Sequence, residues 1–260
     1  MKKQKMLSAL FFLLLAGLLF SCKEPETEDP ETGKLKVQFS FMVDDETLII
    51  DTMAYVNAAG NHYEVNEVKF FISDVYLHKA NGDSIKVKHN NSVHYVDYDI
   101  PTTLLWSIND EIPQGSYSAI SFTFGISPDK NISNAYVNPP ESTMAWPAVL
   151  GGGYHYMMIN GKWQTDTINS VFHFHTGIGQ IREGETITGF VHNNFNVQVP
   201  NSGFVISETP VLLNLSMNIN NWFTSPNDYD FNYWGGGIMQ NQDAQVVIRE
   251  NGWNVFSIKN

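Results

Sequence analysis

The 260-residue chain has a single cysteine, Cys22, and only 16% charged side chains. One thiol cannot form a disulfide within the chain, and it cannot supply the sets of thiolates that hold structural zinc. The sequence also lacks a Gly-x-Ser-x-Gly motif, a phosphate-binding loop, a His-Glu-x-x-His motif and a dinucleotide-binding glycine pattern. Because no nucleophile and base can be paired, we predict that the protein is not an enzyme.

Positive charge is scarce as well, which limits the partners of the chain. It has 15 Lys and Arg against 27 Asp and Glu, for a formal net charge of −12. The basic residues form no cluster beyond the first few positions. We therefore expect no nucleic-acid partner, since such partners require a basic surface.

The first 21 residues have the features of a secretory signal. Basic residues precede an apolar run from Leu7 to Phe20, and the small Ser21 precedes Cys22. The run is short for a membrane span but typical of a signal peptide. Its end, Leu-Phe-Ser-Cys, resembles a bacterial lipobox, so residues 1–21 are predicted to be removed and Cys22 to be lipidated.

Residues 22–33 are predicted to form a disordered acidic tether. They are rich in Glu, Pro and Thr and have no apolar residue after Cys22, so they cannot bury surface. Acidic residues directly after the lipid-bearing cysteine resemble the surface-export signal of Bacteroidetes lipoproteins. We expect a lipoprotein of the cell envelope, held at the outer membrane on its periplasmic or its outer side.

Residues 34–260 have the composition and periodicity of one all-β domain. In the segment 35–43 apolar residues alternate with more polar ones, which is the period of a half-buried strand. Similar strand patterns recur along the chain between clusters of Gly, Pro, Asn and Asp, and helical patterns are weak and confined to segments 102–108 and 241–250. These features predict a single antiparallel β-sandwich with long loops.

The segment SVFHFHTG, residues 170–177, holds the best candidates for chemistry. In a strand His173 and His175 project from the same face, about 7 Å apart, while Phe172 and Phe174 face the other way. Two imidazoles at this spacing can reach one metal ion, although they can also be ordinary polar residues of a strand. Imidazole ligands suit copper, zinc, iron and nickel alike.

An upstream segment, GGGYHYMMING, adds a third histidine. If the chain folds back about residue 165, His155 lies opposite His175, and Met157 lies opposite His173. Three histidines and a thioether would then share one patch, and a thioether favours copper over hard cations. The prediction depends on register, because a slip of one residue sends a side chain to the other face.

A second hypothesis is a non-catalytic envelope module that binds a glycan or a peptide. Exposed aromatic side chains near the glycines 235–237 would provide stacking surface for such a ligand: Trp222, Tyr229, Tyr233 and Trp234. The other glycine run, 151–153, lacks the strand–helix context of a phosphate site. We interpret it as a loop.

Four blocks of sequence resemble the MbnP-like family of copper-associated periplasmic proteins and lipoproteins. They are YEVNEVKFFISDVYL (63–77), SVHYVDYD with YSAISFTFGI (92–99 and 117–126), MAWPAVLGGGYHYMMING with FHFHTG (144–161 and 172–177), and SMNINNWF with IMQNQDAQVVIRENGWNVF (216–223 and 238–256). Together they span nearly the whole mature chain. The order Met-x-Trp-Pro, Gly-Gly-Tyr-His, His-Thr-Gly is the most specific part.

The resemblance implies a β-sandwich that binds copper through histidines, for acquisition, buffering or delivery. His175 matches the histidine of the family's His-Gly type motif, and Trp146 matches the tryptophan of Met-x-Trp. Apart from the resemblance, we expect Met144 and Met157 near the metal. In some members a dihaem partner of the cytochrome-peroxidase type oxidises this tryptophan to kynurenine. Here residues 147–150 replace the second tryptophan of the family pattern, and this departure speaks against kynurenine at Trp146.

Overall fold

The computed structural model describes residues 30–259, so the predicted signal peptide and Cys22 lie outside the described residues. Its elements in chain order are β1 (Thr32–Val43), β2 (Glu46–Thr47), β3 (Tyr55–Val56), β4 (His62–Lys79), β5 (Ser84–Lys86), η1 (His89–Ser92), β6 (Val93–Asp97), α2 (Pro101–Leu104), β7 (Leu105–Pro113), β8 (Gly115–Phe124), η2 (Glu141–Met144), η3 (Ala148–Leu150), β9 (Met157–Gln164), β10 (Asn169–Thr176), β11 (Ile178–Glu183), β12 (Thr186–His192), β13 (Phe195–Gln198), β14 (Phe204–Ile206), β15 (Val211–Asn218), η4 (Ile219–Phe223), α3 (Phe231–Trp234), α4 (Gln242–Asn251), η5 (Gly252–Asn254) and β16 (Phe256–Ile258).

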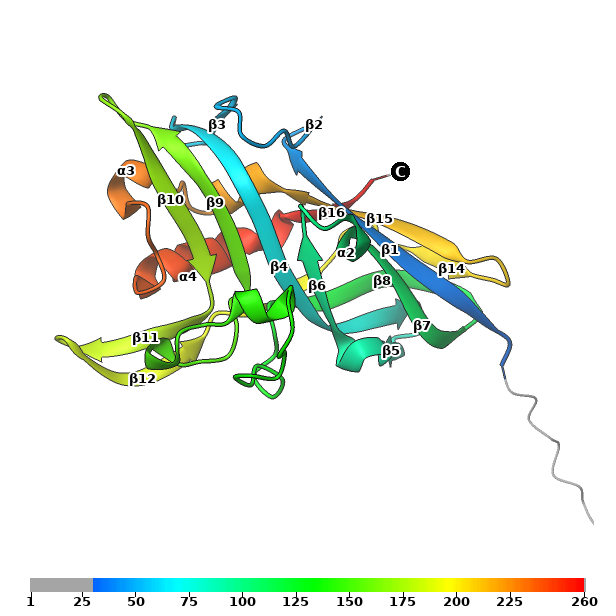
Figure 1. The fold of residues 1–260 in the computed structure, drawn as a ribbon. Helices are drawn as coiled ribbons and strands as arrows, with labels where there is room; N and C mark the ends of the chain where they lie inside the picture. The colour runs from blue at the N-terminus through cyan, green and yellow to red at the C-terminus, as the bar shows by residue number, and fades with distance from the viewer. Residues whose placement is uncertain (1–29, 260) are drawn as a thin grey trace, which may run out of the picture. The chain divides into compact units, whose positions relative to one another are not determined.

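Two large sheets and one hairpin make up the fold (Figure 1). The five-stranded sheet has the order β16-β15-β1-β2, with β7 also paired to β1. The nine-stranded sheet has the order β10-β9-β4-β8-β13, with β3, β5 and β6 paired to β4 and β14 paired to β8. The hairpin is β11-β12. This arrangement confirms the predicted all-β, sandwich-like class.

One strand pair departs from the predicted antiparallel arrangement. β1 and β15 run parallel, from Leu35 opposite Val211 to Met42 opposite Asn218. A parallel pair requires a long crossover between its strands. Here most of the domain lies between β1 and β15 in the sequence, so no short turn forces the antiparallel direction.

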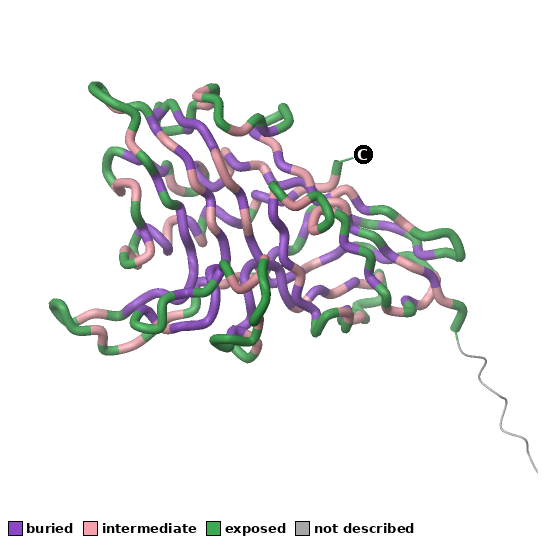
Figure 2. The backbone as a smooth tube through the Cα atoms, in the orientation of Figure 1, coloured by how far each residue is buried: buried purple, intermediate pink, exposed green. Residues whose placement is uncertain are grey.

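The main core consists of apolar side chains from the facing sides of the two large sheets, together with residues of η4, α3 and α4. Alternate residues of β1 are buried as their period predicts, and none of them is more than 5% exposed: Leu35, Val37, Phe39, Phe41 and Val43. Phe39 meets Phe70 of β4 edge to face, with ring centres 6.0 Å apart. Figure 2 shows long buried stretches along the strands of the nine-stranded sheet, while exposed residues gather in the connections.

β4 is buried on both faces, because the nine-stranded sheet carries a second cluster on the side away from the main core. We call that side the outer face. Phe70 and Ile72 of β4 belong to the main core, whereas Phe71 belongs to the outer cluster. The segment 125–156 supplies most of the other members of this cluster, which are Val93, Tyr95, Ile126, Met144, Trp146, Leu150, Tyr154, Tyr156 and Ile178.

The first strand begins at Thr32, two residues before the predicted start of the domain. Thr32 pairs with Pro113 of β7, so Thr32 and Gly33 belong to the sheet and not to the tether. Gly33 is required there, because a Cβ at this position would lie 2.1 Å from the carbonyl oxygen of Ser207. Gly33, which the sequence predicts to lie in the tether, is therefore part of a tightly packed strand.

The weak helical pattern at 241–250 is confirmed as the ten-residue α4. The pattern at 102–108 is only partly helical, because α2 ends at Leu104 and the chain continues as β7. α4 begins after Asn241, whose side chain accepts a hydrogen bond from the backbone N–H of Ala244 and so caps the helix. Ala244 and Ile248, one turn apart, bury one side of the helix in the main core. Within residues 30–259, no helix combines the length and apolarity needed to cross a membrane.

Candidate metal centre

The predicted alternation along β10 is confirmed. Phe172 and Phe174 are each 1% exposed in the main core. His173 and His175 lie on the outer face, where His173 is exposed and His175 is only 8% exposed. The two imidazoles therefore share a face, but they differ in their access to water.

The predicted register of the β9–β10 hairpin is wrong. Met157 pairs with Thr176, Met158 with His175, and Asn160 with His173. The turn comprises residues 165–168, and the backbone N–H of Thr165 bonds to the carbonyl of Ile168. Because the shift is an odd number of residues, Met157 faces the main core and is fully buried there, away from the histidines.

His155 nevertheless lies beside His175, because a loop and not a strand places it. Its backbone N–H and its ring Nδ1 both contact the carbonyl oxygen of Met144, at 2.7 and 2.9 Å. The His155 ring centre is 5.0 Å from that of His175, which in turn is 5.6 Å from that of His173. The three imidazoles thus form a row with His175 in the middle.

Trp146 extends this row on the far side of His155. Its ring centre is 4.7 Å from that of His155, in an edge-to-face arrangement, and its Nε1–H donates to the carbonyl oxygen of Leu150. A Cβ on Gly177 would lie 2.7 Å from the Trp146 ring. The glycine of the His-Thr-Gly segment thus makes room for the tryptophan.

The loop that carries Trp146 and His155 closes on itself. Trp146 donates its backbone N–H to the carbonyl of Gly153, and Ala145 bridges to Tyr154. The three glycines 151–153 all have positive φ, at 117°, 71° and 78°. Their interpretation as a loop is confirmed, since side-chain-bearing residues rarely adopt this conformation.

Burial keeps the two inner imidazoles neutral. Desolvation lowers the pKa of His175 to about 3, and the neighbouring His155 and His173 rings act in the same direction. Desolvation also lowers the pKa of His155, although its hydrogen bond to the carbonyl of Met144 has the opposite effect. Neutral imidazole is the form that binds metals.

One atom in this row has no hydrogen-bond partner among residues 30–259. His175 Nδ1 is buried within the described part of the chain and contacts no donor or acceptor there. Buried nitrogens are normally satisfied, so an unpaired one requires an explanation. A metal ion at this nitrogen would supply the missing partner.

A small cavity of about 420 Å³ opens beside His173 and His175, and its other lining residues are Gly237, Met239 and Gln240. The backbone carbonyl of Met239 accepts a hydrogen bond from the side-chain amide of Gln245, which is 1% exposed in α4. The oxygen of the same Gln245 side-chain amide accepts a hydrogen bond from the backbone N–H of Gly177. Met239 therefore lines the cavity beside the histidines, and Met158 lies opposite His175 in the hairpin. No spacing in the sequence indicates the contact of Met239.

A complete three-residue ligand set is not preformed. Among residues 30–259, no three His, Cys, Asp or Glu side chains are arranged so that they could hold one metal ion. The pair His155 and His175 is the closest approach of two candidate ligands. Metal–nitrogen bonds are about 2.0–2.1 Å long, so small side-chain rotations would let both rings reach one ion.

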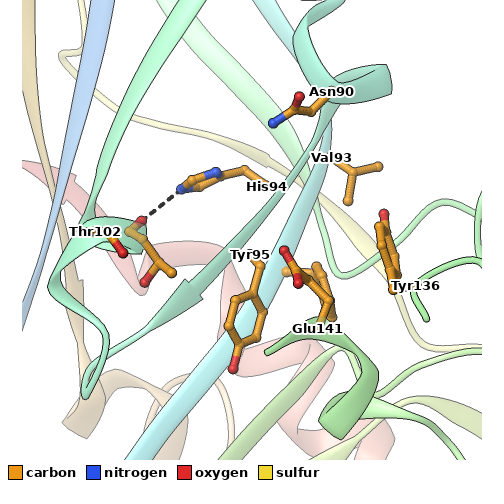
Figure 3. Close-up of a pocket in the computed structure, with 9 residues that line it drawn as sticks. Asn90, Val93, His94, Tyr95, Thr102, Tyr136 and Glu141 are labelled. Atoms are coloured by element: carbon orange, nitrogen blue, oxygen red, sulfur yellow. Dashed lines mark hydrogen bonds between the residues drawn. The ribbon is translucent and has the colours of Figure 1, made fainter. Parts of the chain in front are cut away.

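A second cavity, of about 440 Å³, lies elsewhere on the outer face (Figure 3). Tyr95, Tyr136 and Glu141 line it, and burial, followed by the charge of Glu141, raises the pKa of Tyr136 to about 12. His94 also lines this cavity, but its Nε2 contacts the carbonyl of Thr103 at 2.8 Å, and its ring stacks on Trp106. His94 is therefore a structural residue.

The aromatic surface of the second hypothesis is largely absent. Trp222 and Tyr229 have no exposed surface and belong to the main core, so their prediction as stacking residues is wrong. Tyr233 is 76% exposed, and Trp234 is partly buried against the core. Bulky aromatic residues near glycines can be core or surface, and their contacts decide which.

Comparison with known proteins agrees with this architecture. The solved structure of MbnP from Methylosinus trichosporium superposes with a TM-score of 0.54, at 16% identity, over 87% of this chain and 98% of that chain. None of the curated proteins compared is significantly similar in sequence. The sequence model of the MbnP family matches residues 32–241. Because that match covers most of the chain, the protein belongs to the MbnP family.

Proposed function

We propose that this protein binds copper, in the reduced Cu(I) state, through His155 and His175, with His173 and Met239 at the mouth of the site. The observation that carries the proposal is the buried Nδ1 of His175, which lies next to the His155 ring and has no hydrogen-bond partner within residues 30–259. Family membership supports it, because the resemblance that we drew from the sequence connects MbnP-like proteins with copper.

The donor set favours Cu(I) over harder or more demanding ions. Imidazole and thioether are soft to borderline ligands, whereas calcium and magnesium require oxygen ligands. Structural zinc sites need four protein ligands, and no three-residue set of the usual zinc-binding side chains occurs within residues 30–259. Cu(I) accepts low coordination numbers, so a pair of imidazoles with one thioether suffices.

The proposed role is acquisition, buffering or delivery of copper at the cell envelope, without catalysis. Lipidation at Cys22 and attachment to the outer membrane belong to this proposal and rest on the lipobox-like sequence alone. A Cys22→Ala precursor that still partitions into membranes and still incorporates labelled lipid would contradict the anchor.

Oxidation of Trp146 to kynurenine by a dihaem partner stays a prediction of the family resemblance. Trp146 is in contact with His155, which is compatible with it, but residues 147–150 depart from the family pattern. Mass spectrometry of the peptide that contains Trp146, from protein purified from its source, would test this modification.

The test of copper binding is a titration of metal-free protein with Cu(I) against a competing chelator. Wild type should bind one ion, and His155→Ala and His175→Ala should each lose this binding. His62→Ala, at an exposed histidine of β4, is the matched control and should bind as wild type does. Full copper binding by the His155→Ala/His175→Ala double variant would overturn the proposal.

A further inference from the structure

Asn160 of β9 connects two of the candidate ligands. It lies opposite His173 in the hairpin, and its side-chain oxygen Oδ1 is 2.9 Å from His173 Nδ1 and 2.9 Å from His175 Nε2. The other end of the amide, Nδ2, donates to the carboxylate of Glu67, which is the partner of Asn160 on β4. Glu67 also forms an ion pair with Lys69, at 2.5 Å.

This arrangement fixes which way the amide of Asn160 points. A carboxylate only accepts hydrogen bonds, so the NH2 group must face Glu67 and the carbonyl oxygen must face the histidines. The reverse orientation would place two acceptor oxygens in contact. Glu67, held by Lys69, therefore sets the orientation of the amide.

The amide in turn sets the protons on the two imidazoles. A carbonyl oxygen only accepts, so His173 donates from Nδ1 and His175 donates from Nε2. In a neutral imidazole the other nitrogen then carries the lone pair, which is Nε2 in His173 and Nδ1 in His175. This Nδ1 is the buried nitrogen that has no partner in the described part of the chain. His155 donates from Nδ1 to the carbonyl of Met144 in the same way, which leaves its lone pair on Nε2.

We propose that Asn160 is a positioning residue, oriented by Glu67, that fixes the tautomers of His173 and His175 so that His175 offers Nδ1 to the metal. The metal-binding part of this inference rests on the proposed function, whereas the assignment of the tautomers does not. Hydrogen-bond partners of metal-bound histidines typically change metal affinity by about 10–100-fold when they are removed.

The test combines two measurements on each variant. Proton–nitrogen correlation spectra of the imidazole rings, recorded on metal-free protein at neutral pH, report the tautomers, and chelator competition reports the Cu(I) affinity. In wild type we expect the proton of His173 on Nδ1 and that of His175 on Nε2. In Asn160→Ala the fixed tautomers should be lost, and the affinity should fall about 10–100-fold.

Two further variants separate positioning from general damage. Asn160→Asp places a second carboxylate against Glu67, so it should weaken copper binding. The double variant Glu67→Gln/Asn160→Asp exchanges the charges and restores a donor–acceptor pair, so it should recover the tautomers and most of the affinity. Asn196→Ala is the matched control, because its amide pairs with Thr123 and lies on β13, at the opposite edge of the nine-stranded sheet from β10.

A proton on Nδ1 of His175 in the wild type, or unchanged tautomers and affinity in Asn160→Ala, would overturn the inference. If wild type shows the predicted tautomer of each histidine but binds no copper, the proposed function is overturned instead. The role of Asn160 in fixing the tautomers would then still be supported.

Discussion

At the scale of single residues, Phe174 and His175 are neighbours in the sequence with opposite surroundings. Phe174 packs edge to face on Phe223 and Tyr229 in the main core, whereas His175 contacts Asn160 and His155 on the outer face. Phe174→Ala should lower the free energy of unfolding of the metal-free protein by about 3–5 kcal/mol. His175→Ala should change that stability little, because it removes one hydrogen bond and no large apolar surface.

Chemical denaturation of both variants, with and without Cu(I), measures this contrast. A metal that binds only the folded state adds stability as RT ln(1 + [L]/Kd). His175→Ala should lose this gain, and Phe174→Ala should retain a copper-dependent gain on top of a lower baseline. Equal copper-induced gains in wild type and His175→Ala would show that the metal binds elsewhere.

The protonation of His175 makes a second prediction at this scale. If the ligands had the ordinary histidine pKa, copper affinity would fall as the pH drops below about 6.5. Burial lowers the pKa of His175 to about 3, so protons compete with the metal for this residue only in strong acid. Between pH 7 and pH 5, the Cu(I) affinity should therefore fall much less than a tenfold loss per pH unit. Chelator competition at the two pH values measures this, and a steep decline below pH 6.5 would contradict the buried site.

At the scale of elements, the hairpin shows what period can and cannot determine. The alternation of Phe and His on β10 correctly predicts which face each residue takes, since the period of a strand is two. The register depends on the turn, and residues 165–168 contain no glycine or proline that would fix its type. The predicted register was therefore wrong by an odd number of residues, so that Met158, and not Met157, lies on the face of the histidines.

The packing of Gly177 against Trp146 gives a prediction for the loop. In Gly177→Ala the new Cβ would lie 2.7 Å from the Trp146 ring, so the ring must move and His155 with it. We expect a loss of about 1–3 kcal/mol in the free energy of unfolding, together with weaker copper binding. Thermal melting and copper titration measure the two effects.

Gly189→Ala on β12 is the control, because its nearest neighbour, Ile181 Cδ1, is at an ordinary contact distance of 3.4 Å. It should leave both stability and copper binding near wild type. Normal binding by Gly177→Ala would show that the contact between Trp146 and His155 does not position the ligand.

At the scale of the whole molecule, long-range contacts account for most of what the sequence could not predict. The all-β class, the strand faces and α4 follow from periodicity and capping. Met239 comes to the histidines from the segment before α4, and Gln245 of α4 contacts both Met239 and Gly177. No local pattern encodes these contacts, and the pairing of Asn160 with His173 depends on the hairpin register. His155 reached its predicted neighbour by a different route, through the loop and its bond to Met144.

Buried neutral histidines should make the whole fold sensitive to mild acid. Burial lowers the pKa of His94 to about 4 and that of His175 to about 3, and it lowers the pKa of His155 as well, against an ordinary value of 6.5. Below pH 6.5 these histidines take up protons in the unfolded chain but stay neutral in the folded protein. The free energy of unfolding therefore decreases as the pH falls. For His94 alone, the loss between pH 7.5 and pH 5 is about 2 kcal/mol.

Urea denaturation of metal-free protein at pH 7.5 and at pH 5 measures this loss. His94→Gln keeps a donor for the carbonyl of Thr103 but cannot take up a proton, so its stability should fall less between the two pH values than that of wild type. His62→Gln, at an exposed position, should fall as much as wild type does. The range from pH 5 to pH 7.5 lies above the pKa values of most carboxylates, so histidines dominate the change in stability. If His94→Gln lost as much stability as wild type, then the pH dependence would come from groups other than the imidazole stacked on Trp106.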